Sequence, residues 1–158
     1  MIMKKPITKD GFKKLQDRLQ ILETVNLPRI IDAISKARAL GDLSENAEYK
    51  AAKEEQAKIN SEIRNIRLKI NNSRVLAPKP SDSIMFGAEA TLVDLSNSIE
   101  FVYKFVGDYE SDYESGKISI SSLLGKAAVG KKAGEKFIFS APAGTKEFQV
   151  LTIKYSKN

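Results

Sequence analysis

Two long runs of apolar residues at helical spacing, separated by one short segment, constrain the fold of this chain more than any other feature. In both runs the apolar positions recur every three or four residues, which places them on one face of a helix. Because only Gly41 and the few residues after it separate the runs, the two helices must lie antiparallel and share one interface. The first run comprises Phe12, Leu15, Leu19, Leu22, Leu27, Ile30, Ile34 and Ala37, and the second Tyr49, Ala52, Gln56, Ile59, Ile63, Ile66 and Ile70.

The first run slips by one position around Asn26, Leu27 and Pro28. Pro28 has no amide hydrogen to donate to the carbonyl of Thr24, so we expect a bend or a local irregularity there rather than the end of the helix. Thr8 is suited to cap the start of this helix, and Gly41 is suited to the C′ position at its end. The second helix is expected to end at residues 71–73.

After residue 76 the pattern changes. Residues 77–83 have the composition of a linker, and short β-like runs separated by turn residues follow. We expect no internal repeat. The sequence therefore predicts an α+β protein with a helical coiled-coil hairpin at 1–76, a linker at 77–83 and a small, mainly antiparallel β domain at 84–158. The expected strands are Ala88–Val93, Ile99–Val106, Lys117–Ile120, Phe137–Ala141 and Phe148–Tyr155, with a short helix at Leu123–Val129.

Composition excludes several classes of protein and site. No run of eighteen apolar residues is present, and the first residues lack the apolar stretch of a secretory signal. The chain has no cysteine and no histidine, which removes disulfides, thiolate metal sites and the commonest general base. Any metal would therefore be held by oxygen ligands, which favours magnesium, calcium or manganese.

The positive charge of the chain lies in its first half. Residues 1–76 contain 16 Lys and Arg against 10 Asp and Glu, whereas residues 77–158 contain 10 of each. Such a basic half suits an anionic partner such as a nucleic acid, although a solvated helix face rich in lysine would have the same composition.

Three acidic residues, Asp42, Glu45 and Glu48, crowd the segment between the two helices, and two interpretations of them stay open. Asp42 and Glu45 have the spacing of a capping box, in which each side chain bonds the backbone of the other residue. Alternatively, residues three apart lie on one helical face, so the three carboxylates would converge on a common cation.

Basic residues beside the acidic ones favour the second interpretation. Arg38, Lys50 and Lys53 would hold phosphate close to a metal bound at the tip. Magnesium usually takes only one or two carboxylates from one protein element and completes its shell with water and substrate phosphate. The tip therefore resembles half of a magnesium site whose remainder must come from a partner.

The segment from Gly41 to Tyr49, Gly-Asp-Leu-Ser-Glu-Asn-Ala-Glu-Tyr, followed by Ala51-Ala52-Lys53-Glu54, resembles the tip motif of the Gre family of bacterial transcript cleavage factors. Shorter matches follow in the family's order, so the resemblance covers nearly the whole chain. They are Phe86-Gly87-Ala88, Val106-Gly107-Asp108, Gly130-Lys131 and the ending Phe148 to Tyr155.

The resemblance implies that the hairpin enters the secondary channel of bacterial RNA polymerase and induces the polymerase to cleave backtracked RNA near its 3′ end. Asp42 and Glu45 would hold Mg²⁺ jointly with the polymerase, so the chain would stimulate another enzyme rather than act as one. The second domain would be FKBP-like and dock at the channel rim. We expect a cytoplasmic monomer that binds polymerase and the nascent RNA 3′ end but no membrane. Asn46, Glu48 and Tyr49 match the rest of the tip signature, and Arg38, Lys50 and Lys53 would face the RNA.

The chain departs from the family pattern at a few positions. Lys53 stands where many relatives have arginine, and Ser44 where several have lysine. The segment Ser121-Ser122-Leu123-Leu124 replaces the family's Ser-Pro turn, so the local shape there is open.

Rival functions remain at this point. A regulator could enter the same channel and inhibit polymerase without cleavage, although the intact pair Asp42 and Glu45 argues against it. A proline isomerase or chaperone would need an aromatic-lined pocket in the second domain. A structural coiled-coil spacer would not need charges crowded at its apex.

Overall fold

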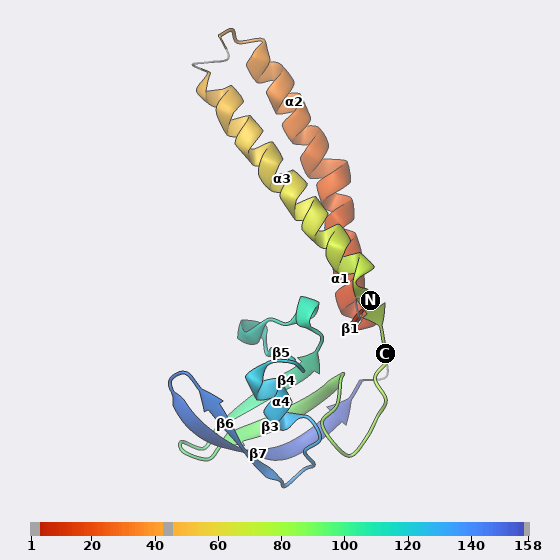
Figure 1. Ribbon diagram of the computed structural model, residues 1–158, viewed down its shortest axis with the longest axis vertical. Helices are drawn as coiled ribbons and strands as arrows, with labels where there is room; N and C mark the ends of the chain where they lie inside the picture. Colours follow the sequence, from red (N-terminus) through yellow and green to blue (C-terminus); the bar gives the residue numbers. More distant parts are fainter. Residues whose placement is uncertain (1–3, 43–45, 157–158) are drawn as a thin grey trace. The chain divides into compact units, whose positions relative to one another are not determined.

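The computed structural model describes residues 4–42 and 46–156, which form two compact units of different architecture (Figure 1). One unit, Phe12–Asn72, is helical. The other joins the N-terminal segment, through Gly11, with the residues from Ser73 onward, and it is built on a β-sheet. The predicted α+β class is confirmed.

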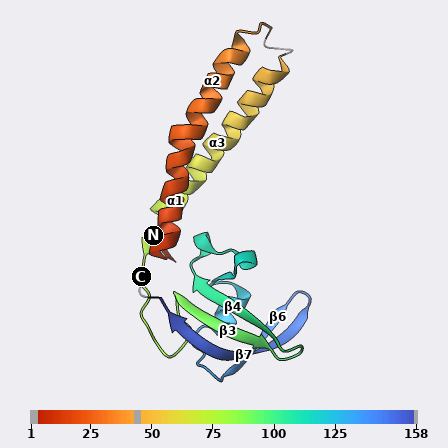
Figure 2. The ribbon, with the colours of Figure 1, turned by 180° about the vertical axis from the view of Figure 1, so that it is seen from behind.

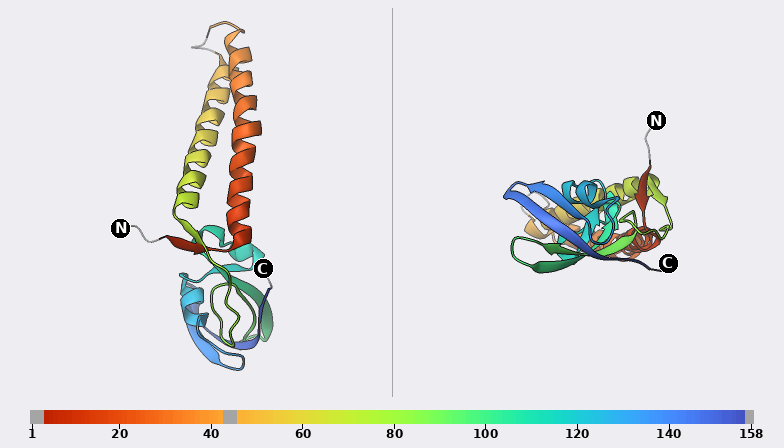
Figure 3. Two further views of the ribbon diagram at one scale, coloured as in Figure 1. Left: turned by 90° about the vertical axis from the view of Figure 1, so that its right-hand side faces the viewer. Right: turned by 90° about the horizontal axis from the view of Figure 1, so that it is seen from below.

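The helical unit is an antiparallel hairpin. Its first arm consists of the end of α1 (Lys9–Ile21), the π-helix η1 (Leu22–Asn26) and α2 (Leu27–Arg38), and its second arm is α3 (Ala47–Asn71). The arms lie side by side along their length (Figures 1 and 3). Both predicted apolar runs face the shared interface, which confirms them. The buried members are Leu22, Ile30, Ile34, Ala37, Ala52, Ile59, Ile63 and Ile66.

The irregularity expected near Pro28 is the π-helix η1, which ends two residues before the proline. Within it the amide of Leu27 bonds the carbonyl of Leu22, five residues back. A π-turn adds one residue to the helix, and this shifts the apolar run by the one position seen in the sequence. Leu22 is fully buried at the slip. The π-helix therefore keeps both halves of the first run on the same interface.

Ion pairs also join the two arms of the hairpin. Arg18 bonds Glu62 with Nε–Oε1 2.8 Å and Nη2–Oε2 3.1 Å, and Arg67 lies 3.2 Å from Glu23. Because these side chains are partly exposed, each pair contributes little to stability. Both pairs join residues that face each other across the two arms, in the same register as the apolar contacts.

The β unit contains a five-stranded sheet in the order β5-β4-β3-β7-β6 (Figures 1 and 2). Neighbouring strands are antiparallel except β4 and β5, which are parallel. One face packs with the short helix α4 (Leu123–Ala128) around a core that includes Leu92, Phe105 and Val150. The strands are β3 (Ala88–Asp94), β4 (Ile99–Val106), β5 (Lys117–Ser119), β6 (Lys136–Ala141) and β7 (Gly144–Tyr155).

A second, two-stranded sheet joins segments far apart in the sequence. β1 (Lys5–Ile7) pairs in parallel with β2 (Ser73–Val75), and the amide of Leu76 bonds the carbonyl of Ile7 over 3.0 Å. This pair attaches residues 4–11 to the β unit, whereas the sequence assigned them to the helical domain. The expected linker is tied to the same unit, since the Tyr155 hydroxyl donates to the carbonyl of Ser83 over 2.6 Å.

None of the helices in residues 4–42 and 46–156 is long and apolar enough to cross a membrane.

Candidate functional site

The first arm of the hairpin ends in a short turn. The last residue of α2 is Arg38, and the amide of its C-cap residue, Ala39, still reaches the carbonyl of Ser35. Gly41 follows with φ +121°, a conformation that side chains rarely allow. Gly41 thus lies one position beyond the C′ site expected from the sequence, and the chain turns there into Asp42.

Asn46, rather than Asp42, caps the second arm. The Asn46 Oδ1 accepts a hydrogen bond from the amide of Tyr49 over 3.1 Å, and α3 begins at Ala47. Asp42 precedes this N-cap by four residues and is therefore not the N-cap residue of α3, whereas Glu45, the other residue of the expected capping box, lies outside the described residues. The reason is tertiary: Asn46 Nδ2 also donates to the carbonyl of Ala37 over 2.6 Å, which fixes the cap at this residue.

An aromatic contact also joins the two arms close to the tip. The guanidinium of Arg38 lies over the ring of Tyr49, 5.8 Å from its centroid. Tyr49 is half-buried against the hairpin interface, so its ring holds the arginine at the edge of that interface. Arg38 and Tyr49, two residues of the predicted site, are therefore brought together.

The other charged residues of the predicted site point to solvent. Glu48, Lys50 and Lys53 are exposed on the first two turns of α3, and Lys53 Nζ donates to Gln56 Oε1 over 3.1 Å. Lys50 and Lys53 supply positive charge, and Glu48 negative charge, on the first two turns of α3. Glu45 lies outside the described residues, together with Leu43 and Ser44. Among residues 4–42 and 46–156, no three acidic side chains gather closely enough to hold a metal ion, so the predicted trio of Asp42, Glu45 and Glu48 remains a prediction.

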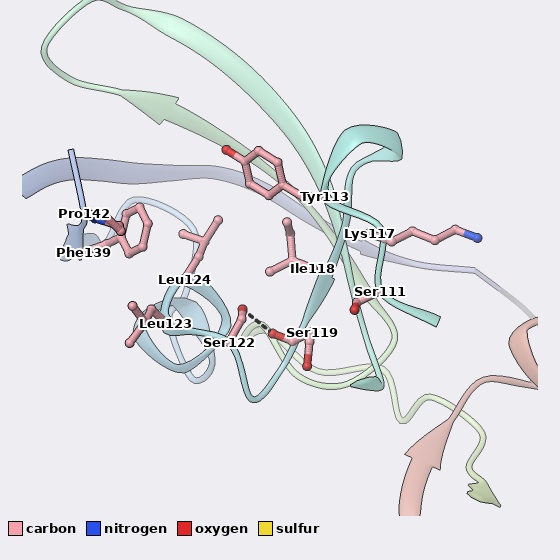
Figure 4. Close-up of a pocket in the computed structure, with 10 residues that line it drawn as sticks. All are labelled: Ser111, Tyr113, Lys117, Ile118, Ser119, Ser122, Leu123, Leu124, Phe139 and Pro142. Atoms are coloured by element: carbon pink, nitrogen blue, oxygen red, sulfur yellow. Dashed lines mark hydrogen bonds between the residues drawn. The ribbon is translucent and has the colours of Figure 1, made fainter. Parts of the chain in front are cut away.

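The β unit carries a half-open apolar pocket of about 300 Å³ beside α4 (Figure 4). Leu123 is 64% exposed at its rim. Ser122 caps α4 by accepting from the amide of Gly125, and its hydroxyl donates to the carbonyl of Ser119 over 2.7 Å. These bonds order the turn at which the chain departs from the family's Ser-Pro pattern. The pocket is lined by Ser111, Tyr113, Lys117, Ile118, Ser119, Ser122, Leu123, Leu124, Phe139 and Pro142.

Two family models match the chain in succession. Residues 5–75 match the model described as "Transcription elongation factor, N-terminal", and residues 79–155 match "Transcription elongation factor, GreA/GreB, C-term". The two matched ranges together span nearly the whole sequence.

Individual proteins are similar over the same length. A transcription elongation factor GreA from Xylella fastidiosa is 40% identical over 156 residues, covering 97% of this chain and 99% of that protein. A GreA from Ralstonia nicotianae is 45% identical over 153 residues, covering 95% of this chain and 97% of the relative. A solved structure of the transcription factor Gfh1 aligns with a TM-score of 0.48 at 24% identity, covering 97% of this chain and 99% of that one.

Proposed function

Because the chain belongs to the GreA/GreB family of transcription elongation factors, we propose that it binds bacterial RNA polymerase and induces the polymerase to cleave backtracked RNA near its 3′ end. The hairpin would carry its tip through the secondary channel to the polymerase active site. The chain would supply ligands and charge there and would not cleave RNA alone. We infer that it acts as a monomer in the cytoplasm.

The observation that carries the proposal is the position of Asp42. Asp42 is exposed at one end of the hairpin and precedes Asn46, the N-cap residue of α3, by four positions. Asp42 and Glu45 would hold Mg²⁺ together with ligands of the polymerase. This donor set suits magnesium, which binds through one or two carboxylates and leaves room for water and phosphate. When bound, magnesium polarises phosphoryl oxygens and lowers the pKa of a bound water.

The remaining tip residues would position this carboxylate and the RNA. Asn46 fixes the start of α3 against α2 through its bond to Ala37. Arg38, Lys50 and Lys53 would attract the phosphates of the extruded RNA, an electrostatic contribution that salt weakens. The hairpin residues thus bind and orient, and the polymerase supplies the rest of the catalytic site.

The apolar pocket beside α4 is our candidate for the contact with the channel rim. Its lining is mostly apolar, and the exposed Leu123 offers an anchor for a side chain of the partner. A regulator that inhibits without cleavage would use the same contact, so binding alone does not separate the two functions.

A transcription complex halted in a backtracked register tests the proposal. Adding the full chain with Mg²⁺ should shorten the labelled RNA from its 3′ end, and the shortened RNA should resume elongation when nucleotides are supplied. Omitting polymerase should leave naked RNA intact. Tight binding to polymerase with no RNA shortening would instead indicate the inhibitory regulator.

A further inference from the structure

A tandem repeat lies in the loop between β4 and β5. Residues 108–111 and 112–115 both read Asp-Tyr-Glu-Ser, a repeat that contradicts the expectation of none. The two copies also share local structure: each forms part of a 3-10 turn, and each serine hydroxyl donates to the carbonyl of its own aspartate. Two copies of one motif therefore stand side by side in the β unit.

The first copy binds an extended segment of the chain itself. The ammonium of Lys5 lies 2.9 Å from the Asp108 carboxylate and 5.2 Å from the centre of the Tyr109 ring. The Glu110 carboxylate accepts from both the amide, over 2.7 Å, and the hydroxyl of Thr8. The first Asp-Tyr-Glu-Ser copy thus binds a segment that contains the basic residue Lys5 of β1.

The close approach of that strand is also visible in the backbone. A Cβ added to Gly107, directly before the first copy, would lie 1.8 Å from the carbonyl oxygen of Pro6. Glycine at this position therefore lets the main chain of β1 pass against the start of the motif.

The second copy presents the same residue types to solvent. Tyr113 is 68% exposed, and the exposed Glu114 forms no ion pair within residues 4–42 and 46–156. Asp112 accepts from the hydroxyl of Ser115 over 2.6 Å, which orders its carboxylate. In the first copy Lys5 pairs with the aspartate, Asp108, and Thr8 bonds the glutamate, Glu110; the corresponding carboxylates of the second copy are Asp112 and Glu114.

An open strand edge runs beside the second copy. β4 pairs with β5 only through Lys104–Val106, so the preceding residues, 99–103, have no strand next to them on that side in the described chain. Since the Lys104 amide donates to the Gly116 carbonyl from this edge, the alternation of a strand directs the main-chain groups of Val102 and Glu100 to the same side. Gly116 lies close to the Val102 carbonyl, where a Cβ on the glycine would be 3.0 Å from the oxygen. Ile99 and Val102 are more than half exposed there.

A groove joins the edge and the motif. Its volume is about 540 Å³, and its lining includes Tyr113, whose ring centre lies 6.0 Å from that of Tyr103 on β4. Tyr113 also lines the pocket of Figure 4, so it stands between the two hollows. The groove is lined by Phe101, Val102, Tyr103, Tyr113, Glu114, Ser115 and Gly116.

We propose that this groove binds an extended, basic segment of a partner protein as an added strand on β4. Main-chain bonds to the edge would hold the segment, and a lysine or arginine would lie over the Tyr113 ring close to the carboxylates of Asp112 and Glu114, in the way that Lys5 lies over Tyr109 and pairs with Asp108. The charge fits this occupant, because Glu100, Asp112 and Glu114 are acidic and the residues from 107 to 116 include no lysine or arginine. The inference does not rest on the proposed function.

The test is an NMR titration of the full chain, labelled with ¹⁵N, with the capped peptide Thr-Val-Lys-Val-Thr. The capped peptide Thr-Val-Glu-Val-Thr is the control. The lysine peptide should shift the amide signals of Glu100, Val102 and residues 113–116, and the glutamate peptide should not. Tyr113→Leu, which keeps an apolar side chain, should raise the Kd of the lysine peptide about threefold, the loss of one exposed cation–π contact. Glu114→Gln should raise it similarly and should make binding less sensitive to salt.

Glu55→Gln makes the same change of charge on an exposed residue of the helical unit and should leave the Kd unchanged. Several outcomes would overturn the proposal: equal binding of the two peptides, shifts confined to another surface, or no shift at millimolar peptide. Shifts at the β4 edge that depend on protein concentration instead of peptide would show that a second copy of the chain occupies the groove, and would also overturn it.

Discussion

The side chain of Asn46 donates a hydrogen bond to the carbonyl oxygen of Ala37 over 2.6 Å and thereby joins the first turn of α3 to the last turn of α2. The same side chain accepts from the amide of Tyr49. One amide group thus serves both helix ends at the tip, each of which would otherwise leave backbone groups unpaired. The two functions of this side chain can be separated by mutation.

Asn46→Asp should keep the acceptor for Tyr49 and lose the donor to Ala37, whereas Asn46→Ala should lose both. We expect Asn46→Ala to cost about 1–2 kcal/mol of local stability and Asn46→Asp less, on the order of 1 kcal/mol. Hydrogen exchange of the Tyr49 amide checks this directly. Exchange that is equally slow in the wild type and in Asn46→Ala would contradict the capping role.

The π-helix η1 should depend on Pro28. Deleting Val25, an exposed residue of η1, would restore a regular helix and bring Pro28 into conflict with a carbonyl four residues back. We expect the deletion to destabilise the hairpin by about 3 kcal/mol. Combining it with Pro28→Ala should recover most of that loss in urea unfolding. Equal instability of the single and double variants would show that η1 has another cause.

Acid should weaken the attachment of β1 through Asp108. Donation from the hydroxyls of Ser119 and Ser121 and the nearby Lys5 ammonium lower the pKa of Asp108 from its ordinary value of 3.8 to about 2. Since the folded pKa is the lower one, the stabilisation is fully present above about pH 4 and is lost as pH falls through about 2.

Asp108→Asn should therefore destabilise the β unit at pH 5 but cost much less at pH 2. The cost in unfolding free energy at pH 5 should exceed the cost at pH 2 by on the order of 1 kcal/mol. This is less than the free energy that corresponds to the whole pKa shift, because the Asp108 side chain is 31% exposed and solvent screens its charge. Chemical unfolding at both pH values measures it. A cost that does not change with pH would indicate that the carboxylate's charge is not what stabilises this contact.

Much of the fold was predictable because it rests on local patterns. The two apolar runs at helical spacing identified both arms of the hairpin. The predicted bounds of β4, Ile99–Val106, agree with the structure. The slip at Pro28 predicted an irregularity but not its type, since a bend and a π-helix give similar sequences. In each case the deciding signal lies within a dozen residues.

The features that were missed depend on contacts between distant residues. β1 and β2 are three residues each, one contains Pro6, and they pair across more than sixty positions, so neither has a periodic signal. Asp42 and Asn46 are both good N-cap residues, and the bond to Ala37 decides between them. The repeat at 108–115 was visible in the sequence, but its two different environments follow only from the packing of β1.

Lys53→Glu should weaken RNA cleavage through its effect on the RNA phosphates. The loss should be greater for long backtracked RNA than for short, and greater at low salt, because the contribution is electrostatic. Lys14→Glu, the same change on an exposed residue of α1 far along the hairpin from the tip, should have little effect. Equal losses for both RNA lengths, or for both variants, would remove Lys53 from the RNA contact.

The central claim is that the tip carboxylate of Asp42 acts on a metal shared with the polymerase, and Asp42→Asn tests it most directly. The asparagine should leave the fold and the affinity for polymerase unchanged, because the substitution keeps the size of an exposed side chain and the N-cap of α3 is Asn46. We predict that this variant binds a backtracked transcription complex as the wild type does but no longer shortens its RNA, with partial recovery at high Mg²⁺. Cleavage at the wild-type rate by the bound variant would contradict the account.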